Sequence, residues 1–302
     1  MEKAILKTLI YADIFDYPLN FFEIHKWLIG KKATLRQVES AIGRLVKSSK
    51  LKVKSEYYFL PKRQELVLKR KRRGKQSKVY LRKAKLIVAI LRIIPWIKLV
   101  GISGGLSMEN AAKSDDIDLF LVVSKNRLWL SRIMTVGLLS VTGQRRTVKD
   151  SKRKIAGKLC LNILLEENRL VQSSKDIYLA HEVLQMKVLW QRDGIYGKYL
   201  EDNNWAFKFL PNWIGPDTSL RGAKGAHTRR VGTSNLLNKE IATPFGLAMT
   251  LENIAKWLQL KMMTKPQGLE RIQEGAVYFH PNDCRLQVLS DFQKRVKRLK
   301  GL

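Results

Sequence analysis

The sequence predicts a mixed α+β fold, and three observations carry that prediction. Residues 1–62 show the apolar periodicity of three short helices and then of two short strands. Residues 96–170 alternate strand-like apolar runs with a helical segment, and residues 171–302 show mainly helical periodicity. With 302 residues and a hydrophobic fraction of 45%, the chain is long enough for two or three domains with ordinary cores.

The N-terminal region, residues 1–62, predicts a small helical domain that ends in a β-hairpin. Its three helices are expected to begin near residues 3, 20 and 34, and Thr34 and Gln37 have the spacing of a capping box. Two short strands follow, over 51–53 and 57–60. This order resembles the winged helix-turn-helix class, which places a helix in the major groove of DNA. Two roles remain open for it: contact with nucleic acid, or packing against the rest of the protein or a second copy.

Residues 63–95 predict a basic helical connector. Its densest run of cations is 69–75, Lys-Arg-Lys-Arg-Arg-Gly-Lys. Apolar residues such as Leu66, Val67 and Ile87 favour a helix over a disordered segment. Such a charge run fits both a solvated helix face and a surface that follows a phosphate backbone.

The most informative stretch is 101–123, which predicts a strand, a Gly-Gly turn, a short helical turn and a second strand. The apolar runs over 97–102 and 117–123 predict that both strands are buried. Asp116 and Asp118 are one residue apart on the second strand, so their side chains emerge on one face about 7 Å apart. Two such carboxylates repel each other unless a cation lies between them, and Mg²⁺ is commonly held by one or two carboxylates plus substrate phosphates. Gly104 and Gly105 let the backbone approach a phosphate closely.

This stretch resembles the signature of the DNA polymerase β-type nucleotidyltransferases. That signature is an apolar residue, Gly, then Gly or Ser, a spacer, and Asp-apolar-Asp-apolar. Here the spacer is 106–115 and the final part is Asp116-Ile117-Asp118-Leu119. The resemblance implies a small mixed sheet with helices, a nucleoside triphosphate as substrate, and Mg²⁺ or Mn²⁺ held by the two aspartates. It also implies phosphate binding by Gly104 and Gly105, with a hydroxyl supplied by Ser103 or Ser107. The alternative role for both serines is to cap the turn.

Members of this superfamily usually supply a third carboxylate from a later strand, as a general base or an extra metal ligand. The later strand is predicted over 158–165 and is followed by glutamates. The position that aligns is Asn162, which cannot act as a base. Alternation places Cys160, Asn162 and Glu166 on one face. Glu166, or Asn162 through a water, is therefore expected to orient the acceptor hydroxyl.

Residues 171–302 are expected to form a helical C-terminal domain, which in this superfamily commonly walls the nucleotide site. Helices are predicted over 176–192, 196–210 and 250–264. Between them, residues 211–238 are rich in Gly, Thr and Arg and predict a long irregular loop, which is either mobile or in contact with substrate.

Charge and cysteine content narrow the class of partner. The chain has 57 Lys+Arg against 26 Asp+Glu, a net charge of +31, which favours a polyanionic partner, nucleic acid first. Cys160 and Cys284 have no metal-site spacing and indicate a reducing compartment. The apolar stretches 86–100 and 128–142 are too short or too charged for a membrane span, and no secretion signal opens the chain. A cytoplasmic location is expected.

Two functions follow from these observations. The first is a Mg²⁺-dependent nucleotidyltransferase that moves a nucleoside monophosphate to a hydroxyl of RNA, protein or a small molecule. The second is a catalytically weak or inactive regulator with the same fold, which binds nucleotide and nucleic acid. Asn162 at the position of the third carboxylate favours the second, and the intact Asp-x-Asp favours the first.

Overall fold

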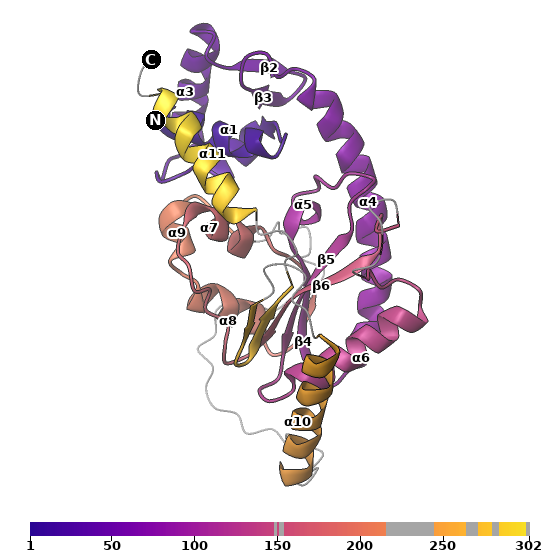
Figure 1. Cartoon of the computed structure of the whole chain (residues 1–302). Helices are drawn as coiled ribbons and strands as arrows, with labels where there is room; N and C mark the ends of the chain where they lie inside the picture. Colours follow the sequence, from indigo (N-terminus) through magenta and orange to yellow (C-terminus); the bar gives the residue numbers. More distant parts are fainter. Residues whose placement is uncertain (148–149, 151–153, 216–244, 264–270, 280–283, 300–302) are drawn as a thin grey trace.

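The protein is a mixed α+β structure (Figure 1), as the sequence predicts. The structure, a computed structural model, describes residues 1–147, 150, 154–215, 245–263, 271–279 and 284–299. Most of the predicted loop over 211–238 lies outside these residues. No helix in the described part of the chain combines the length and apolar character needed to cross a bilayer.

The N-terminal domain has the predicted order of elements. Its helices are α1 (Glu2–Ile14), α2 (Phe21–Lys26) and α3 (Leu35–Lys47). The predicted hairpin strands are β2 (Lys52–Lys54) and β3 (Tyr57–Phe59), and β1 (Leu19–Asn20) joins them in a sheet of order β1-β3-β2. Capping boxes at Asn20 and Thr34 start α2 and α3, so the local sequence sets both helix ends.

A single long helix, α4 (Leu66–Leu91), connects this domain to the rest of the molecule, as predicted for the basic connector. One face is apolar and buried, with Val67, Ala84 and Leu91 among its buried residues. The hydroxyl of Tyr80 donates to the carbonyl of Lys113 at 2.7 Å. Helix α4 is therefore fixed to the loop that leads into the aspartate strand.

A six-stranded sheet of order β7-β4-β5-β6-β9-β8 forms the centre of the molecule. Its strands are β4 (Ile97–Ile102), β5 (Ile117–Val123), β6 (Leu159–Glu166), β7 (Lys187–Gln191), β8 (Arg271–Gln273) and β9 (Ala276–Tyr278). Only the β5–β6 pair is parallel, and α6 (Leu128–Val141) lies in the connection between these two strands. The strands predicted at 97–102, 117–123 and 158–165 are confirmed.

The prediction of a helix over 176–192 is wrong for the second half of this range. Helix α7 (Ile177–Gln185) stops at Met186, whose backbone is extended, and β7 then pairs with β4. The apolar run from Val188 to Trp190 fits a helix or a strand equally well, and the free edge of β4 decides for the strand. Strands β7, β8 and β9 all come from residues after 170, so the sheet extends beyond the range 96–170.

The remaining helices lie around the sheet and the N-terminal domain. The helix predicted over 196–210 is divided into α8 (Ile195–Asp202) and α9 (Ala206–Phe209), and α10 (Phe245–Met262) packs on α6. Helix α11 (Arg285–Arg298) returns to α1 (Figure 1), where Arg295 lies 2.6 Å from the carboxylate of Asp13. The last described helix is thus tied to the first.

The break between α8 and α9 is held by Asn203, which is fully buried. Its side-chain oxygen accepts from the amide of Gln172 at 2.8 Å, and its side-chain nitrogen donates to the carbonyls of Leu170 and Tyr199 at 2.8 and 2.9 Å. This one side chain therefore fixes the segment that follows β6.

Replacing Asn203 by Ala is expected to lower the free energy of unfolding by about 3 kcal/mol, because it leaves three buried backbone groups without partners. Denaturant unfolding would measure this change. The exposed neighbour is the matched control, since Asn204→Ala is expected to stay within about 0.5 kcal/mol of the parent protein. Equal effects of the two substitutions would contradict the prediction.

Candidate functional site

Five of the residues predicted for the site line one cavity of about 320 Å³ beside the sheet. They are Ser103, Gly104, Asp116, Asp118 and Asn162. Helix α5 (Gly104–Ser107) begins at the glycine turn, and β5 begins between the two aspartates. Residues of α7, β8 and β9 also line the cavity, so its walls come from both halves of the chain.

The two aspartates converge, as their spacing predicts. Carboxylate oxygens of Asp116 and Asp118 and the sulfur of Cys160 all lie within 4.8 Å of one another. Cys160 enters because it pairs with Asp118 across the parallel strands. Burial, with the nearby aspartates, raises the pKa of the Cys160 thiol to about 12, so it is a neutral thiol. The donors that suit Mg²⁺ or Mn²⁺ are therefore the two carboxylates.

The surroundings of Asp118 disfavour its ionised form. Burial raises the pKa of Asp118 to about 8, and the charges of Asp116 and Glu182 add to the rise. The guanidinium of Arg146 lies 2.6 Å from the Asp116 carboxylate and places a positive charge beside the two aspartates. Although burial opposes it, Asp116 holds the pKa of Arg146 above its usual value. Arg146 is not among the residues that the sequence predicts for the site.

Glycine is required at position 104 by the aspartate strand itself. Gly104 has φ +62°, and a Cβ on it would lie 2.8 Å from an oxygen of Asp118. Gly105 has no such constraint, because a Cβ there would meet only the Asn110 carbonyl at 3.7 Å. The amide of Ser103 donates to the Asp118 carbonyl at 3.1 Å. The turn is therefore built against Asp118.

The two serines beside this turn have different surroundings. The Ser103 hydroxyl faces the cavity and accepts a bond from the side-chain nitrogen of Asn162 at 3.4 Å. The Ser107 hydroxyl instead donates to the Gly104 carbonyl at 2.7 Å. Neither Ser107 nor Gly105 lines the 320 Å³ cavity. Ser107 thus stabilises the turn.

Glu166 does not share a face with the aspartates, contrary to the prediction from alternation. In the β5–β6 pair, Leu119 lies opposite Leu161 and the next β5 residue lies opposite Ile163, so Asn162 is an extra residue. This bulge reverses the alternation beyond it. Burial raises the pKa of Glu166, while hydrogen bonds from backbone amides at the start of α6 oppose the rise. Glu166 therefore caps α6 on the opposite face of the sheet.

A different carboxylate, Glu182 of α7, enters the cavity. It accepts hydrogen bonds from the Gly104 amide and from the side-chain nitrogen of Gln185, the latter at 2.5 Å. Burial raises its pKa to about 7, and the two hydrogen bonds oppose that rise. The sequence carries no signal for this residue, because α7 lies far along the chain from the Gly-Gly turn.

Three arginines line the same cavity: Arg146, Arg271 and Arg285. Arg285 lies 2.6 Å from the carboxylate of Asp176, and the Arg271 guanidinium lies 5.2 Å from the centre of the Tyr278 ring. Carboxylates for a cation and guanidiniums for an anion thus face one space, which suits a metal-bound phosphate ester.

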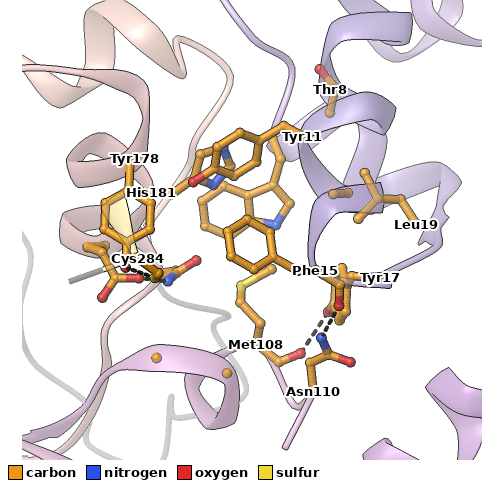
Figure 2. Close-up of a pocket in the computed structure, with 16 residues that line it drawn as sticks. Thr8, Tyr11, Phe15, Tyr17, Leu19, Met108, Asn110, Tyr178, His181 and Cys284 are labelled. Atoms are coloured by element: carbon orange, nitrogen blue, oxygen red, sulfur yellow. Dashed lines mark hydrogen bonds between the residues drawn. The ribbon is translucent and has the colours of Figure 1, made fainter. Parts of the chain in front are cut away.

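A second cavity of about 190 Å³ lies between the N-terminal domain, α5 and α7 (Figure 2). We call it the aromatic chamber, because its walls include six aromatic side chains: Tyr11, Phe15, Tyr17, Trp27, Tyr178 and His181. It shares Gly104, Tyr178, Glu182 and Cys284 with the first cavity, and neither aspartate lines it. The two cavities therefore adjoin at the Gly104 turn.

Comparison with known proteins adds no relative. No protein-family model matches the chain, and no curated protein matches it. The functional assignment therefore depends on the residues and geometry of the two adjoining cavities.

Metal binding is expected to respond in opposite directions to changes at two site residues. Asp118→Asn removes a ligand and is expected to abolish Mn²⁺ binding. Arg146→Gln removes the cation that competes for Asp116 and is expected to tighten Mn²⁺ binding about tenfold, or roughly 1.4 kcal/mol. Titration calorimetry measures both, with Arg145→Gln as the control. Weaker binding by the Arg146 variant would contradict this role.

The same titration is expected to depend on pH. A metal can bind Asp118 only after its proton leaves, so the apparent Mn²⁺ affinity rises between pH 6 and the pKa of about 8, and then levels off. Asp116→Asn lowers the pKa of Asp118 by removing a neighbouring charge and is expected to shift this rise to lower pH in any residual binding. A flat profile over this range would contradict the protonated state of Asp118.

Proposed function

We propose that the protein is a Mg²⁺-dependent nucleotidyltransferase that moves a nucleoside monophosphate from a nucleoside triphosphate to a hydroxyl. The observation that carries the proposal is the convergence of Asp116 and Asp118 against the Gly104 turn, in a cavity that also presents three arginines. Asp116 and Asp118 would hold Mg²⁺ or Mn²⁺, which would stabilise the charge that develops on the phosphates.

The chain's own residues then have separate roles. Arg146 and Arg271 neutralise phosphate oxygens, as their place in the cavity allows. Ser103 and Asn162, which bond to each other, orient the nucleotide at the start of β5 and β6. Glu182 takes the proton of the acceptor hydroxyl on a carboxylate oxygen, in the place of the third carboxylate. Its pKa of about 7 suits a general base near neutral pH.

A second function, the weakly active or inactive regulator, is favoured by one observation. Next to the two aspartates, where a third carboxylate is expected, the chain has the neutral Cys160 and the amide Asn162. Such a protein would bind nucleotide and metal without turnover. The two functions differ in what a substitution of Glu182 does: it lowers transfer by the enzyme, whereas the inactive regulator has no transfer to lose.

The test is transfer of label from α-labelled ATP, CTP, GTP and UTP to total RNA, to a protein extract or to no acceptor, with and without Mg²⁺. We expect label only with metal, and none with Asp116→Asn. Glu182→Gln is expected to lower transfer by a factor of 10² to 10⁴ while Mn²⁺ binding persists. Glu166→Gln, the matched control on the opposite face of the sheet, is expected to retain transfer. Nucleotide binding without any transfer would favour the regulator.

We also propose nucleic acid as the macromolecular partner, bound on the outer face of α4. Five exposed cations recur there at alternating spacings of four and three residues: Lys71, Lys75, Lys78, Arg82 and Lys85. They form a stripe about 21 Å long on one side of the helix. Residues 66–108 contain no Asp or Glu, so no acidic side chain of this segment offsets the stripe. Neutralising five phosphates gives affinity that falls steeply with salt.

The salt dependence of binding to duplex DNA or duplex RNA tests this surface. Changing Lys71, Lys78 and Lys85 together to Ala is expected to reduce the slope of log K against log salt by about 3, one for each lost phosphate contact. Lys125→Ala, at an exposed position in the β5–α6 turn, is the control and leaves the slope unchanged. An unaltered slope in the triple variant would show that the phosphate contacts lie elsewhere on the protein. If the triple variant loses binding to anionic vesicles while its binding to duplexes is unchanged, the partner of this surface is a membrane.

A further inference from the structure

The aromatic chamber has chemistry unlike that of the cavity beside it. Its sixteen lining residues include no Lys or Arg, although the chain has 57 of them, whereas three arginines line the neighbouring cavity. A phosphate or carboxylate would find no cation in the chamber. The neighbouring cavity therefore offers positive charge to an anion, and the chamber does not.

One buried polar atom in the wall of the chamber lacks a partner among the described residues. His181 is 6% exposed, and its Nε2 has no hydrogen-bond partner among the described residues. Burial lowers the pKa of His181 to about 3, so the imidazole is neutral. The ring of His181 stacks on that of Tyr11 (Figure 2), with 4.2 Å between the ring centres and 11° between the planes. The centre of the Trp27 ring lies 5.4 Å from that of His181. The imidazole is thus held in place with one nitrogen unsatisfied, a state that a ligand can relieve.

The size and walls of the chamber indicate what fits. An apolar cavity of roughly 150 Å³ takes up benzene, and this one has about 190 Å³. It therefore accommodates one aromatic ring or a small fused pair, and is too small for a whole nucleotide. Phe15 of the N-terminal domain and Met108 after α5 offer apolar contact area for a flat ring (Figure 2). Trp27 also lines the chamber.

We propose that the aromatic chamber is a binding site for an uncharged, planar nitrogen heteroaromatic of nucleobase size, hydrogen-bonded at one edge to Nε2 of His181. The site is formed jointly by the N-terminal domain and α7, so a bound ring couples the two. This inference does not depend on nucleotidyl transfer, because neither aspartate contributes to the chamber.

The experiment uses the full chain and five probes: adenine, guanine, cytosine, uracil and benzene, with inorganic phosphate as the anionic control. Binding is followed by calorimetry and by the ¹⁵N signals of labelled histidine. Two variants examine the site: His181→Phe keeps a stacking ring but removes Nε2, and Ala12→Leu fills the chamber. His25→Phe is the control, because His25 bonds to the Ala33 carbonyl and does not line the chamber.

At least one nucleobase is expected to bind and to shift the ¹⁵N signal of His181, which is recognised as the histidine that stays neutral at pH 5. The same nucleobase is expected to bind about tenfold more weakly to His181→Phe. Ala12→Leu is expected to abolish binding and His25→Phe to preserve it. The proposal is overturned if no nucleobase binds, if only benzene or phosphate binds, or if nucleobase affinity is equal in His181→Phe and the parent. If Ala12→Leu fails to fold, the titration of the parent protein and its ¹⁵N shift still decide between these outcomes.

Discussion

Asp116 and Asp118 are held close together at the buried start of β5, and the placement of the other site residues depends on this. Two carboxylates with little access to water repel each other, and burial pushes the pKa of Asp118 to about 8. Arg146 approaches Asp116 to 2.6 Å and supplies positive charge. Position 104 must be glycine, because the Asp118 carboxylate occupies the space that a side chain would need.

The central sheet makes this confinement possible. Strand β5 pairs on both sides, and its odd-numbered residues from Ile117 to Val123 are fully buried against one apolar cluster. Such a strand cannot rotate to expose its carboxylates, since that would bring its apolar side chains into water. The bulge at Asn162 then turns the end of β6, so that Glu166 serves α6 while Cys160 stays beside the aspartates.

Helix α7 contributes residues to the walls of both cavities. Consecutive residues on it face different environments: His181 lies among the rings of Tyr11 and Trp27, and Glu182 bonds to the Gly104 amide. The same helix therefore borders both cavities, one lined by arginines and one without them. Under the two proposals, metal and phosphate would bind on one side of the Gly104 turn and a neutral ring on the other.

The sequence by itself determined the local features: the capping boxes of α2 and α3, the strands over 97–102 and 117–123, and the convergence of Asp116 and Asp118. Each depends on spacing within a few residues, which periodicity and hydrogen-bond geometry decide. Only the tertiary structure decided that residues 187–191 form an edge strand, that Glu166 leaves the site, and that Arg146, Cys160 and Glu182 join it. Those outcomes depend on which strand edge is free, on one inserted residue in β6, and on contacts between segments far apart in the chain, and none of these leaves a periodic signal in the sequence.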